Sequence, residues 1–239
     1  MYKLLTIIIL LCFFSFPIYA VEKEPWNAEG QFRRAIVVDT GLSALRKSPS
    51  VASTCLRRLR IGRKIFIISS VKNSDGIKYY FVAVTRRTRG YIDASALVSP
   101  SQASDDVRLM RLVENAEGVD KIILAQALVK NFPQSRFCPD AFLAEGRVAE
   151  QIATELSRRT TRHSPRQLDP EIDLERYLLN YSGLDKYNRL GINFQIDPIE
   201  KIYRYDGAAY KKILTRYPKS QAALIASEKL QTLLARENE

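Results

Sequence analysis

Residues 65–84 read IFIISSVKNSDGIKYYFVAV. Two apolar runs rich in β-branched and aromatic side chains, at 65–68 and 79–84, flank the polar sequence Asn73-Ser74-Asp75-Gly76. Such runs are typical of β-strands, and glycine adopts the positive φ that a tight turn requires. The stretch therefore predicts a β-hairpin.

The second run of this hairpin carries three consecutive aromatic residues. Side chains alternate between the two faces of a strand, so Tyr80, Val82 and Val84 share one face, which we expect to be the core face. Tyr79 and Phe81 lie on the other face. Two roles stay open for them: they line a ligand groove, or they pack beneath the second half of the chain, which is the role that we favour.

Shorter apolar runs flank the hairpin on both sides. They occur at 35–38, 44–45 and 90–92, and turn-forming residues separate them at 48–50 and at Gly62. A series of short strands with turns between them favours a small β-barrel over residues 35–100.

Three of these segments resemble a known family. Residues 44–50 (ALRKSPS), 59–65 (LRIGRKI) and 90–92 (GYI) followed by 96–98 (ALV) are similar to the opening, middle and closing motifs of bacterial SH3-like (SH3b) domains. The asparagine and glycine usual in the opening motif are absent, and Tyr91 stands where the closing motif has tryptophan. The resemblance implies a barrel that binds cell-wall material or peptides rather than a catalyst.

Most of the excess positive charge lies in the same region. The chain has 239 residues with 37 Lys+Arg and 26 Asp+Glu, which gives a net charge of +11. Residues 35–100 hold 12 of the basic residues and only three acidic ones, so this small region carries +9. Such a surface attracts anionic partners. In a secreted protein these would be envelope polymers, peptidoglycan carboxylates or lipid headgroups rather than nucleic acid.

The arginines of this region form two groups in the sequence. Guanidinium groups bind carboxylate or phosphate through paired hydrogen bonds, so arginines beside a tyrosine are candidates for anion recognition. The alternative, a solvated basic face without a ligand, stays open. The candidate anion surface consists of Arg57, Arg58, Arg86, Arg87, Arg89 and Tyr91, and the candidate groove aromatics are Tyr79 and Phe81.

After residue 100 the apolar residues recur at intervals of three and four. Leu109, Leu112 and Val113 follow this spacing behind Ser104, which we expect to cap a helix. The fold class expected is α+β in separate domains: a small SH3-like β-barrel at 35–100 followed by an α-helical, tetratricopeptide-like domain at 101–239. Further helices are expected over 120–131, from Pro139 onward, and over 171–181, 198–217 and 221–236, with a loop at 160–170.

A short motif occurs twice in the helical half. Residues 130–135 (KNFPQS) followed by Ala141 match residues 215–220 (TRYPKS) followed by Ala226. In each copy a helix ends at an aromatic residue, proline prevents its continuation, and serine begins the next helix. This turn resembles the one that joins helices in tetratricopeptide repeats of bacterial envelope proteins. The resemblance implies helical hairpins that stack.

The first 20 residues have the composition of a secretory signal peptide. Lys3 precedes an apolar run at 4–16, and a proline and the small residue Ala20 follow it. The run is too short to span a bilayer, so we expect cleavage after Ala20, a linker at 21–34, and a secreted, periplasmic or envelope location. The alternatives are an uncleaved membrane anchor and lipidation of Cys12.

Two cysteines, Cys55 and Cys138, remain once the leader is removed. A disulfide between them is an option in an oxidising compartment, but the neighbouring apolar residues Leu56 and Phe137 favour two separate buried thiols. The single histidine, His163, has no second histidine or cysteine near it in the sequence, so we expect no metal site and no cysteine–histidine nucleophile.

The expected function is that of a non-catalytic secreted adaptor that needs no cofactor. Its basic SH3-like module would contact an anionic envelope polymer or peptide, and its helical repeats would hold a protein partner. The first alternative is a purely structural envelope protein with an unused basic face. The weakest alternative is a cell-wall hydrolase accessory, because catalytic carboxylates converge in space rather than in sequence.

Overall fold

The hairpin predicted at residues 65–84 is present in the computed structural model, which describes residues 33–162, 178, 182–197, 200 and 202–235. β4 (Lys64–Lys72) pairs antiparallel with β5 (Lys78–Ala83). Gly76 in the turn has a φ of 76°, which few other residues tolerate. The side-chain oxygen of Asn73 accepts hydrogen bonds from the N–H groups of Asp75 and Ile77, at 3.0 and 2.8 Å, and closes the turn.

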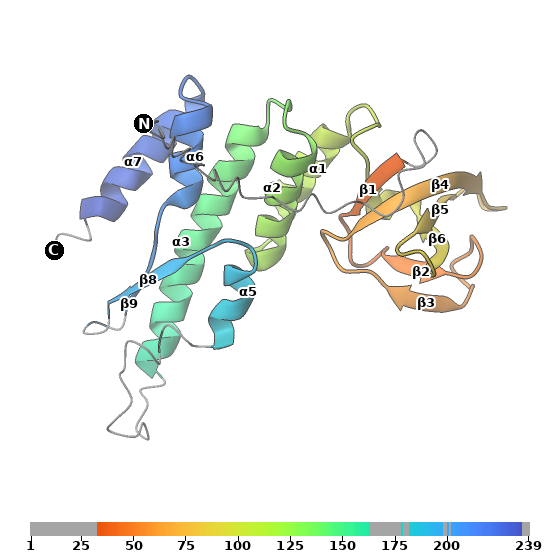
Figure 1. Cartoon of the computed structure of the whole chain (residues 1–239), viewed down its shortest axis with the longest axis horizontal. Helices are drawn as coiled ribbons and strands as arrows, with labels where there is room; N and C mark the ends of the chain where they lie inside the picture. The colour runs from red at the N-terminus through yellow and green to blue at the C-terminus, as the bar shows by residue number, and fades with distance from the viewer. Residues whose placement is uncertain (1–32, 163–177, 179–181, 198–199, 201, 236–239) are drawn as a thin grey trace, which may run out of the picture. The chain divides into compact units, whose positions relative to one another are not determined.

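The hairpin is the centre of a seven-stranded antiparallel sheet with the order β3-β2-β6-β5-β4-β1-β7 (Figure 1). The prediction of several short strands is confirmed. The strand order is linear, so β3 and β7 are the two edges and the sheet is not closed. The edge strand β7 is only two residues long. The other strands are β1 (Arg33–Val37), β2 (Ala44–Arg46), β3 (Cys55–Arg58), β6 (Arg89–Asp93) and β7 (Leu97–Val98).

The sheet curls around an apolar core of its own (Figure 1). Tyr80, Val82 and Val84 face this core, as their alternation predicts, and Tyr79 and Phe81 point to the opposite, outer face. A short 3-10 helix, η1 (Ala94–Ala96), leads from β6 to β7. The core contains Ala35, Val37, Leu45, Leu59, Ile65, Ile67, Tyr80, Val82, Val84, Ile92, Ala96 and Leu97.

The helices expected after residue 100 are present at four of the predicted places: behind Ser104, over 120–131, from about Pro139 onward, and over 221–236. Ser104 does occupy the N-cap position of α1, but its side chain makes no capping hydrogen bond and its φ is 66°. The Asp105 carboxylate instead accepts a hydrogen bond from the Ser99 N–H at 2.7 Å. The long helices are α1 (Asp105–Asn115), α2 (Gly118–Asn131), α3 (Cys138–Arg162), α6 (Ala208–Arg216) and α7 (Gln221–Ala235), with the short η2 (Ser182–Leu184) and α5 (Asp185–Asn188) between α3 and β8.

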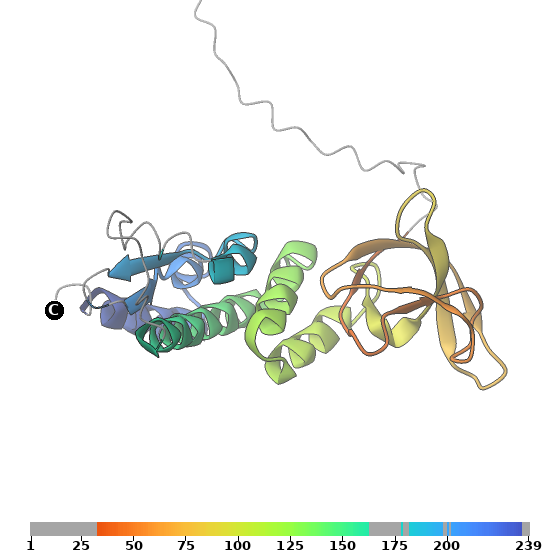
Figure 2. The ribbon, with the colours of Figure 1, turned by 90° about the horizontal axis from the view of Figure 1, so that it is seen from below.

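The prediction of one helix over 198–217 is wrong. β8 (Phe194–Asp197) and β9 (Ile202–Tyr205) form a second hairpin, and α6 begins only after Gly207, whose φ is 71°. Tyr203 and Tyr205 are buried while Arg204 between them is not, which is the two-residue period of a strand. Figure 2 shows this hairpin lying along α3. The Tyr203 N–H donates to Ser157 Oγ at 2.8 Å.

Two of the other expectations fall mainly outside the described residues. The helix expected over 171–181 lies outside them apart from Leu178, which is helical and buried. The loop expected at 160–170 begins instead with the last residues of α3, and His163 lies outside the described residues.

The two copies of the aromatic-proline turn have the same conformation. Phe132 after α2 has φ and ψ of −126° and 59°, and Tyr217 after α6 has −134° and 49°. In each copy the serine three residues later donates its N–H to the carbonyl of the aromatic residue, at 2.9 Å for Ser135 and 3.0 Å for Ser220. The following small residues Ala141 and Ala226 are fully buried. The motif therefore builds the same turn twice. The expectation that its serine begins the next helix is confirmed only in the second copy, since α7 begins directly after Ser220 whereas α3 begins three residues after Ser135.

The sheet and the first three helices share a second apolar core, and all of them belong to one compact unit. Ile36 and Val38 of the β1 region pack on α1 and α2, whereas Ala35 and Val37 face the core of the sheet. The first strand therefore has both faces buried. Where the sheet meets α2, a Cβ placed on Gly62 would lie 2.6 Å from Ile123 Cγ2.

β2 reaches β6 only because residue 90 has no side chain. A Cβ on Gly90 would lie 2.7 Å from the carbonyl oxygen of Arg46 and 2.9 Å from Leu45 Cγ. Both distances are shorter than real Cβ contacts, and the nearest atom belongs to backbone that cannot rotate away. Gly90 therefore fixes how closely β2 and its partner β3 approach the rest of the sheet.

We expect Gly90→Ala to destabilise the protein by about 1–3 kcal/mol, because the added methyl group overpacks the β2–β6 contact. Urea unfolding followed by circular dichroism measures the loss. Gly41→Ala is the matched control, since its nearest neighbour is the movable Asp39 Oδ1 at 3.2 Å. Equal stability losses for the two variants would contradict the steric role of Gly90.

A buried carboxyl group, that of Glu145, links α3 to α2 through a hydrogen bond. Glu145 of α3 is 2% exposed, and its Oε1 accepts a hydrogen bond from Gln126 Nε2 at 3.3 Å. The same amide nitrogen donates to the Leu190 carbonyl at 2.8 Å. Burial raises the pKa of the Glu145 carboxyl, although nearby Lys212 and the hydrogen bond from Gln126 act in the opposite direction.

This raised pKa predicts a stability that depends on pH. In the unfolded chain Glu145 ionises at lower pH than in the folded protein, so rising pH between the two pKa values favours unfolding. Glu145→Gln should therefore gain stability relative to the wild type between pH 4 and pH 7, as measured by urea unfolding. Glu228→Gln, which removes an exposed carboxylate, is the control. A stability difference for Glu145→Gln that is independent of pH would contradict the burial cost.

Candidate anion-binding surface

Three side chains from strands that are neighbours in the sheet, β2, β6 and β5, lie in one row across its outer face. The register pairs Arg46 of β2 with Tyr91 of β6, and Tyr91 with Phe81 of β5. Cross-strand partners point to the same face of a sheet. The rings of Phe81 and Tyr91 are 5.0 Å apart at 44°, and both are half-buried. The row therefore places a guanidinium group beside a pair of partly exposed aromatic rings.

Neighbouring rows add further cations and aromatic rings to this face. Arg58 pairs with Ala44 of β2, two residues before Arg46. Arg89 lies two residues before Tyr91, and Ala83, its partner on β5, also pairs with Phe66 of β4. We call this set the outer sheet face: Arg46, Arg58, Phe66, Tyr79, Phe81, Arg89 and Tyr91.

The cations of the outer sheet face form no ion pairs with the carboxylates that the structure describes. Backbone carbonyls hold two of them: Arg46 Nη1 donates to Ser53 at 2.7 Å, and Arg58 Nη1 donates to Gly41 at 3.2 Å. Each guanidinium has five N–H donors, so these bonds orient the groups without saturating them. In the part of the chain that the structure describes, no carboxylate forms an ion pair with Arg46, Arg58 or Arg89.

A carboxylate on the same face, that of Asp93, is hydrogen-bonded elsewhere. Asp93 lies two residues after Tyr91 in β6, and its Oδ1 accepts a hydrogen bond from the Ser95 N–H at 2.7 Å. That bond caps η1. The helical part differs, because there Arg158 and Arg159 both pair with Glu155 at 2.7 Å. Arg46, Arg58 and Arg89 differ from this helical pair, because no ion pair to a carboxylate is found for them among the described residues.

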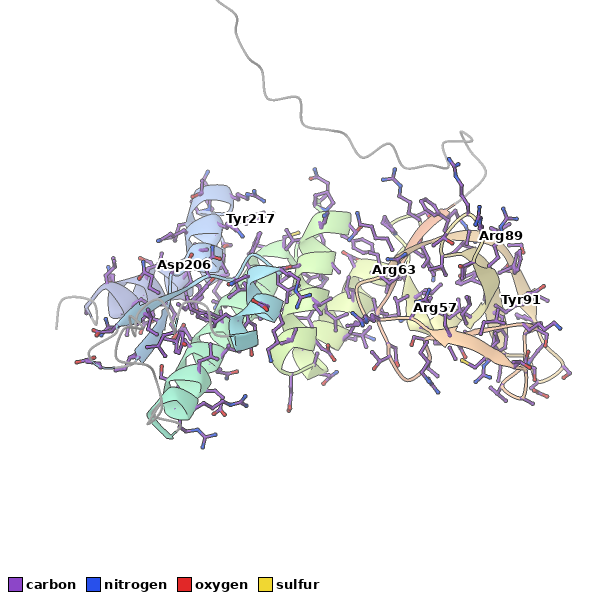
Figure 3. All side chains as sticks on the ribbon, turned by 60° about the horizontal axis from the view of Figure 1, so that its bottom comes forward. Arg57, Arg63, Arg89, Tyr91, Asp206 and Tyr217 are labelled. Atoms are coloured by element: carbon purple, nitrogen blue, oxygen red, sulfur yellow. The ribbon has the colours of Figure 1, made fainter. Side chains whose placement is uncertain are left out.

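The structure brings together only part of the arginines that were candidates from sequence. Arg58, Arg89 and Tyr91 lie on the outer sheet face. Arg57 is exposed on β3 but pairs with Leu45, whose side chain points into the core, so it stands on the other side of the strand. Figure 3 shows Arg57 and Arg63 on a different part of the sheet from Arg89 and Tyr91.

Arg86 and Arg87 belong to the turn between β5 and β6 and are exposed. The turn is closed by hydrogen bonds from the Val84 N–H to the Thr88 carbonyl at 2.9 Å and from the Thr88 N–H to Thr85 Oγ1 at 3.0 Å. The two arginines therefore stand beyond the strand ends, next to Arg89 in the sequence but off the face that carries Tyr91.

The two groove candidates have different environments. Phe81 is half-buried against Tyr91, as a ligand-facing ring would be. Tyr79 is 1% exposed and therefore packs, but the expectation that it packs beneath the second half of the chain is not confirmed. It packs on the outer sheet face between Val71 and Asp93 and is not part of the core shared with the helices. Its hydroxyl is buried and has no hydrogen-bond partner among the described residues.

Sequence reasoning missed two members of this surface, Arg46 and Phe66. Arg46 lies inside the ALRKSPS segment, so the family resemblance covered it, but only the β2–β6 register aligns it with Tyr91. Phe66 lies in an apolar run in which adjacent positions face opposite sides. A signal for Arg46 was the single glycine before Tyr91, because a strand glycine often marks a close backbone approach.

The two cysteines are free thiols with unlike surroundings. Cys138 is buried at the start of α3, and its Sγ donates to the Phe132 carbonyl at 3.3 Å. Burial raises the pKa of this thiol. The expectation that Cys55 is buried is wrong: it is exposed on β3, an edge strand whose four residues all face solvent.

We expect iodoacetamide to alkylate Cys55 in the native protein at pH 8 while Cys138 reacts only after denaturation, because a thiol must be accessible and ionised to react. Peptide mapping by mass spectrometry measures both sites and separates them from Cys12. Cys55→Ser is the control and should leave Cys138 protected. Native alkylation of Cys138 at the rate of Cys55 would contradict this assignment.

Within the described residues, no group of three or more His, Cys, Asp or Glu side chains is placed to hold a metal ion. No helix described by the structure is long and apolar enough to cross a membrane. The leader expected at residues 1–20 and the linker at 21–34 lie outside the described residues, apart from Arg33 and Arg34 at the start of β1.

Comparison of the chain with known protein families, with curated proteins and with solved structures finds no match in any of the three.

Proposed function

We propose that this protein is a non-catalytic adaptor of the bacterial cell envelope that binds an anionic polymer or peptide on its outer sheet face. A single observation carries the proposal: Arg46, Arg58 and Arg89 have no acidic partner among the described residues and share one sheet face with the Phe81–Tyr91 ring pair. No described carboxylate neutralises these three guanidinium groups, so they are available to an anionic ligand.

The chemistry of the surface suits a chain of carboxylate or phosphate groups. Guanidinium groups bind such anions through two parallel hydrogen bonds, and Arg46 is held in place by its bond to Ser53. The half-buried rings offer an apolar platform to the non-ionic part of the same ligand. Both contributions act without proton transfer or bond cleavage, which is why the proposal is binding rather than catalysis.

Two family resemblances fit this proposal. Short antiparallel strands that curl around one core support an SH3-like module, and two equivalent aromatic-proline turns support tetratricopeptide-like hairpins. The helices would hold a protein partner. A groove of about 460 Å³ among α1, α2 and α3 suits this role, since its lining includes the apolar residues Met110, Val113 and Phe137 beside charged ones. The proposed location outside the cytoplasm rests on the leader-like composition of residues 1–20.

A purely structural envelope role is the second candidate, and one observation favours it. Ile36, Val38 and Val98 of the sheet share a core with Leu109 and Val113 of α1. The sheet is thereby fastened to the helices in a way that needs no ligand. In this case the unpaired arginines would only keep the surface solvated.

Co-sedimentation of the purified protein with isolated peptidoglycan sacculi over a salt series tests the proposal. We expect binding that weakens as salt rises, because exposed charges are screened. Arg46→Ala/Arg89→Ala, which removes two cations of the outer sheet face, should weaken binding about tenfold at low salt, equivalent to roughly 1.4 kcal/mol. Arg158→Ala/Arg159→Ala removes the same charge from α3 and should bind like the wild type.

The outcomes separate the candidates. Equal losses for both double variants would mean that net charge alone drives binding and would contradict a specific outer sheet face. Absence of binding at low salt would reject peptidoglycan attachment and favour the structural role. Release of soluble fragments from the sacculi during the assay would revive a hydrolase.

A further inference from the structure

β3 is an open edge of the sheet. It pairs with β2 on one side, and it is the terminal strand in the strand order. All four of its residues, Cys55–Arg58, are exposed, and Leu56 retains 50% of its accessible surface. Within the described residues, no other strand pairs with its second side. A large exposed apolar side chain on an unpaired strand is unusual in a monomeric protein, because such edges recruit further strands.

The hydrogen-bond pattern indicates which backbone groups of β3 are available. The Leu59 N–H donates to the Ser43 carbonyl at 3.0 Å, and Ala44 stands opposite Arg58. Bonded and non-bonded pairs alternate along an antiparallel ladder, so the N–H and C=O groups of Arg58 point away from β2. Leu56 is the extra residue of a bulge between the Leu45 and Arg46 pairs. A donor and an acceptor on the open side are thus ready for another strand.

The side chains of β3 select the charge of that strand. Arg57 and Arg58 point to opposite faces, and in the described part of the chain neither forms an ion pair with a carboxylate. An added strand with two consecutive acidic residues would present one carboxylate to each guanidinium, and opposite charges directly across a ladder stabilise pairing. An adjacent apolar residue would cover Leu56.

We infer that β3 binds an extended acidic peptide as an eighth strand of the sheet. The inference rests on the proposed function and names the ligand class and the mode of binding: backbone hydrogen bonds supply affinity, and the two arginines with Leu56 supply selectivity. A second copy of this chain fits less well, since two β3 edges paired together would place Arg57 and Arg58 against the same residues of the copy.

Peptides that keep their charge but lose backbone donors test this inference. The probe is a labelled hexapeptide of sequence TVEEVT, and fluorescence anisotropy with the full protein measures its affinity. Two forms of the peptide carry N-methyl groups on alternate amides, one form for each side of the strand. We expect one methylated form to lose binding and the other to retain it, since a strand uses only the amides that face its neighbour.

Protein variants identify the edge. Arg57→Ala/Arg58→Ala should weaken binding of the unmodified peptide at least about tenfold, whereas Arg158→Ala/Arg159→Ala, with the same loss of charge, should change it less than about twofold. Circular dichroism verifies that both variants are folded. The methylated peptides require only the wild-type protein, so the inference stays falsifiable even if β3 does not tolerate substitution.

The remaining outcomes overturn strand addition. Equal binding of both methylated peptides would mean that charge on the outer sheet face captures the peptide, which leaves the proposed function intact. No binding of the unmodified peptide at low salt would show that the arginines protect the edge instead of recruiting a strand. Dimers detected by sedimentation velocity that exclude the peptide would assign the edge to a second copy.

Discussion

At Gly90 the backbones of β2 and β6 approach so closely that a methyl group has no room between them. The position of the whole binding region depends on this contact, since β2 carries Arg46 and pairs with β3 at the edge of the sheet. A wider separation would move Arg46 away from Tyr91 and would detach β3 together with Arg58. One absent side chain thus determines whether cations and aromatic rings meet on a common face.

A second constraint fixes that face relative to the rest of the molecule. The apolar run at 35–38 is buried on both sides: Ala35 and Val37 belong to the core of the sheet, and Ile36 and Val38 belong to the core shared with α1 and α2. Burial on both sides leaves only apolar residues at 35–38, and the arginines of β1, Arg33 and Arg34, stand exposed before this run. The cations beside Tyr91 come from β2, β3 and β6, on the part of the sheet that the shared core leaves uncovered.

Local patterns were sufficient for much of the fold. The hairpin at 65–84, the helices α2 and α7, and the two aromatic-proline turns each depend on residues that are close in sequence. The β8–β9 hairpin was missed because its short strand alternates within a stretch rich in tyrosine, where helix and strand spacing are hard to separate. The outer sheet face was only partly foreseen. Arg57 and Arg58 are adjacent in sequence, and only the register, which tertiary contacts set, decides which of them joins Tyr91.

The burial of both sides of the run at 35–38 also determines which part of the protein can be separated from the rest. A sheet excised after Val98 would leave Ile36, Val38 and Val98 without the helical side chains that cover them. Their exposure would cost free energy in proportion to the apolar area returned to water. The sheet alone is therefore not an independent module that could be moved into another chain. The smallest unit that keeps these residues buried includes α1 and α2 together with the sheet.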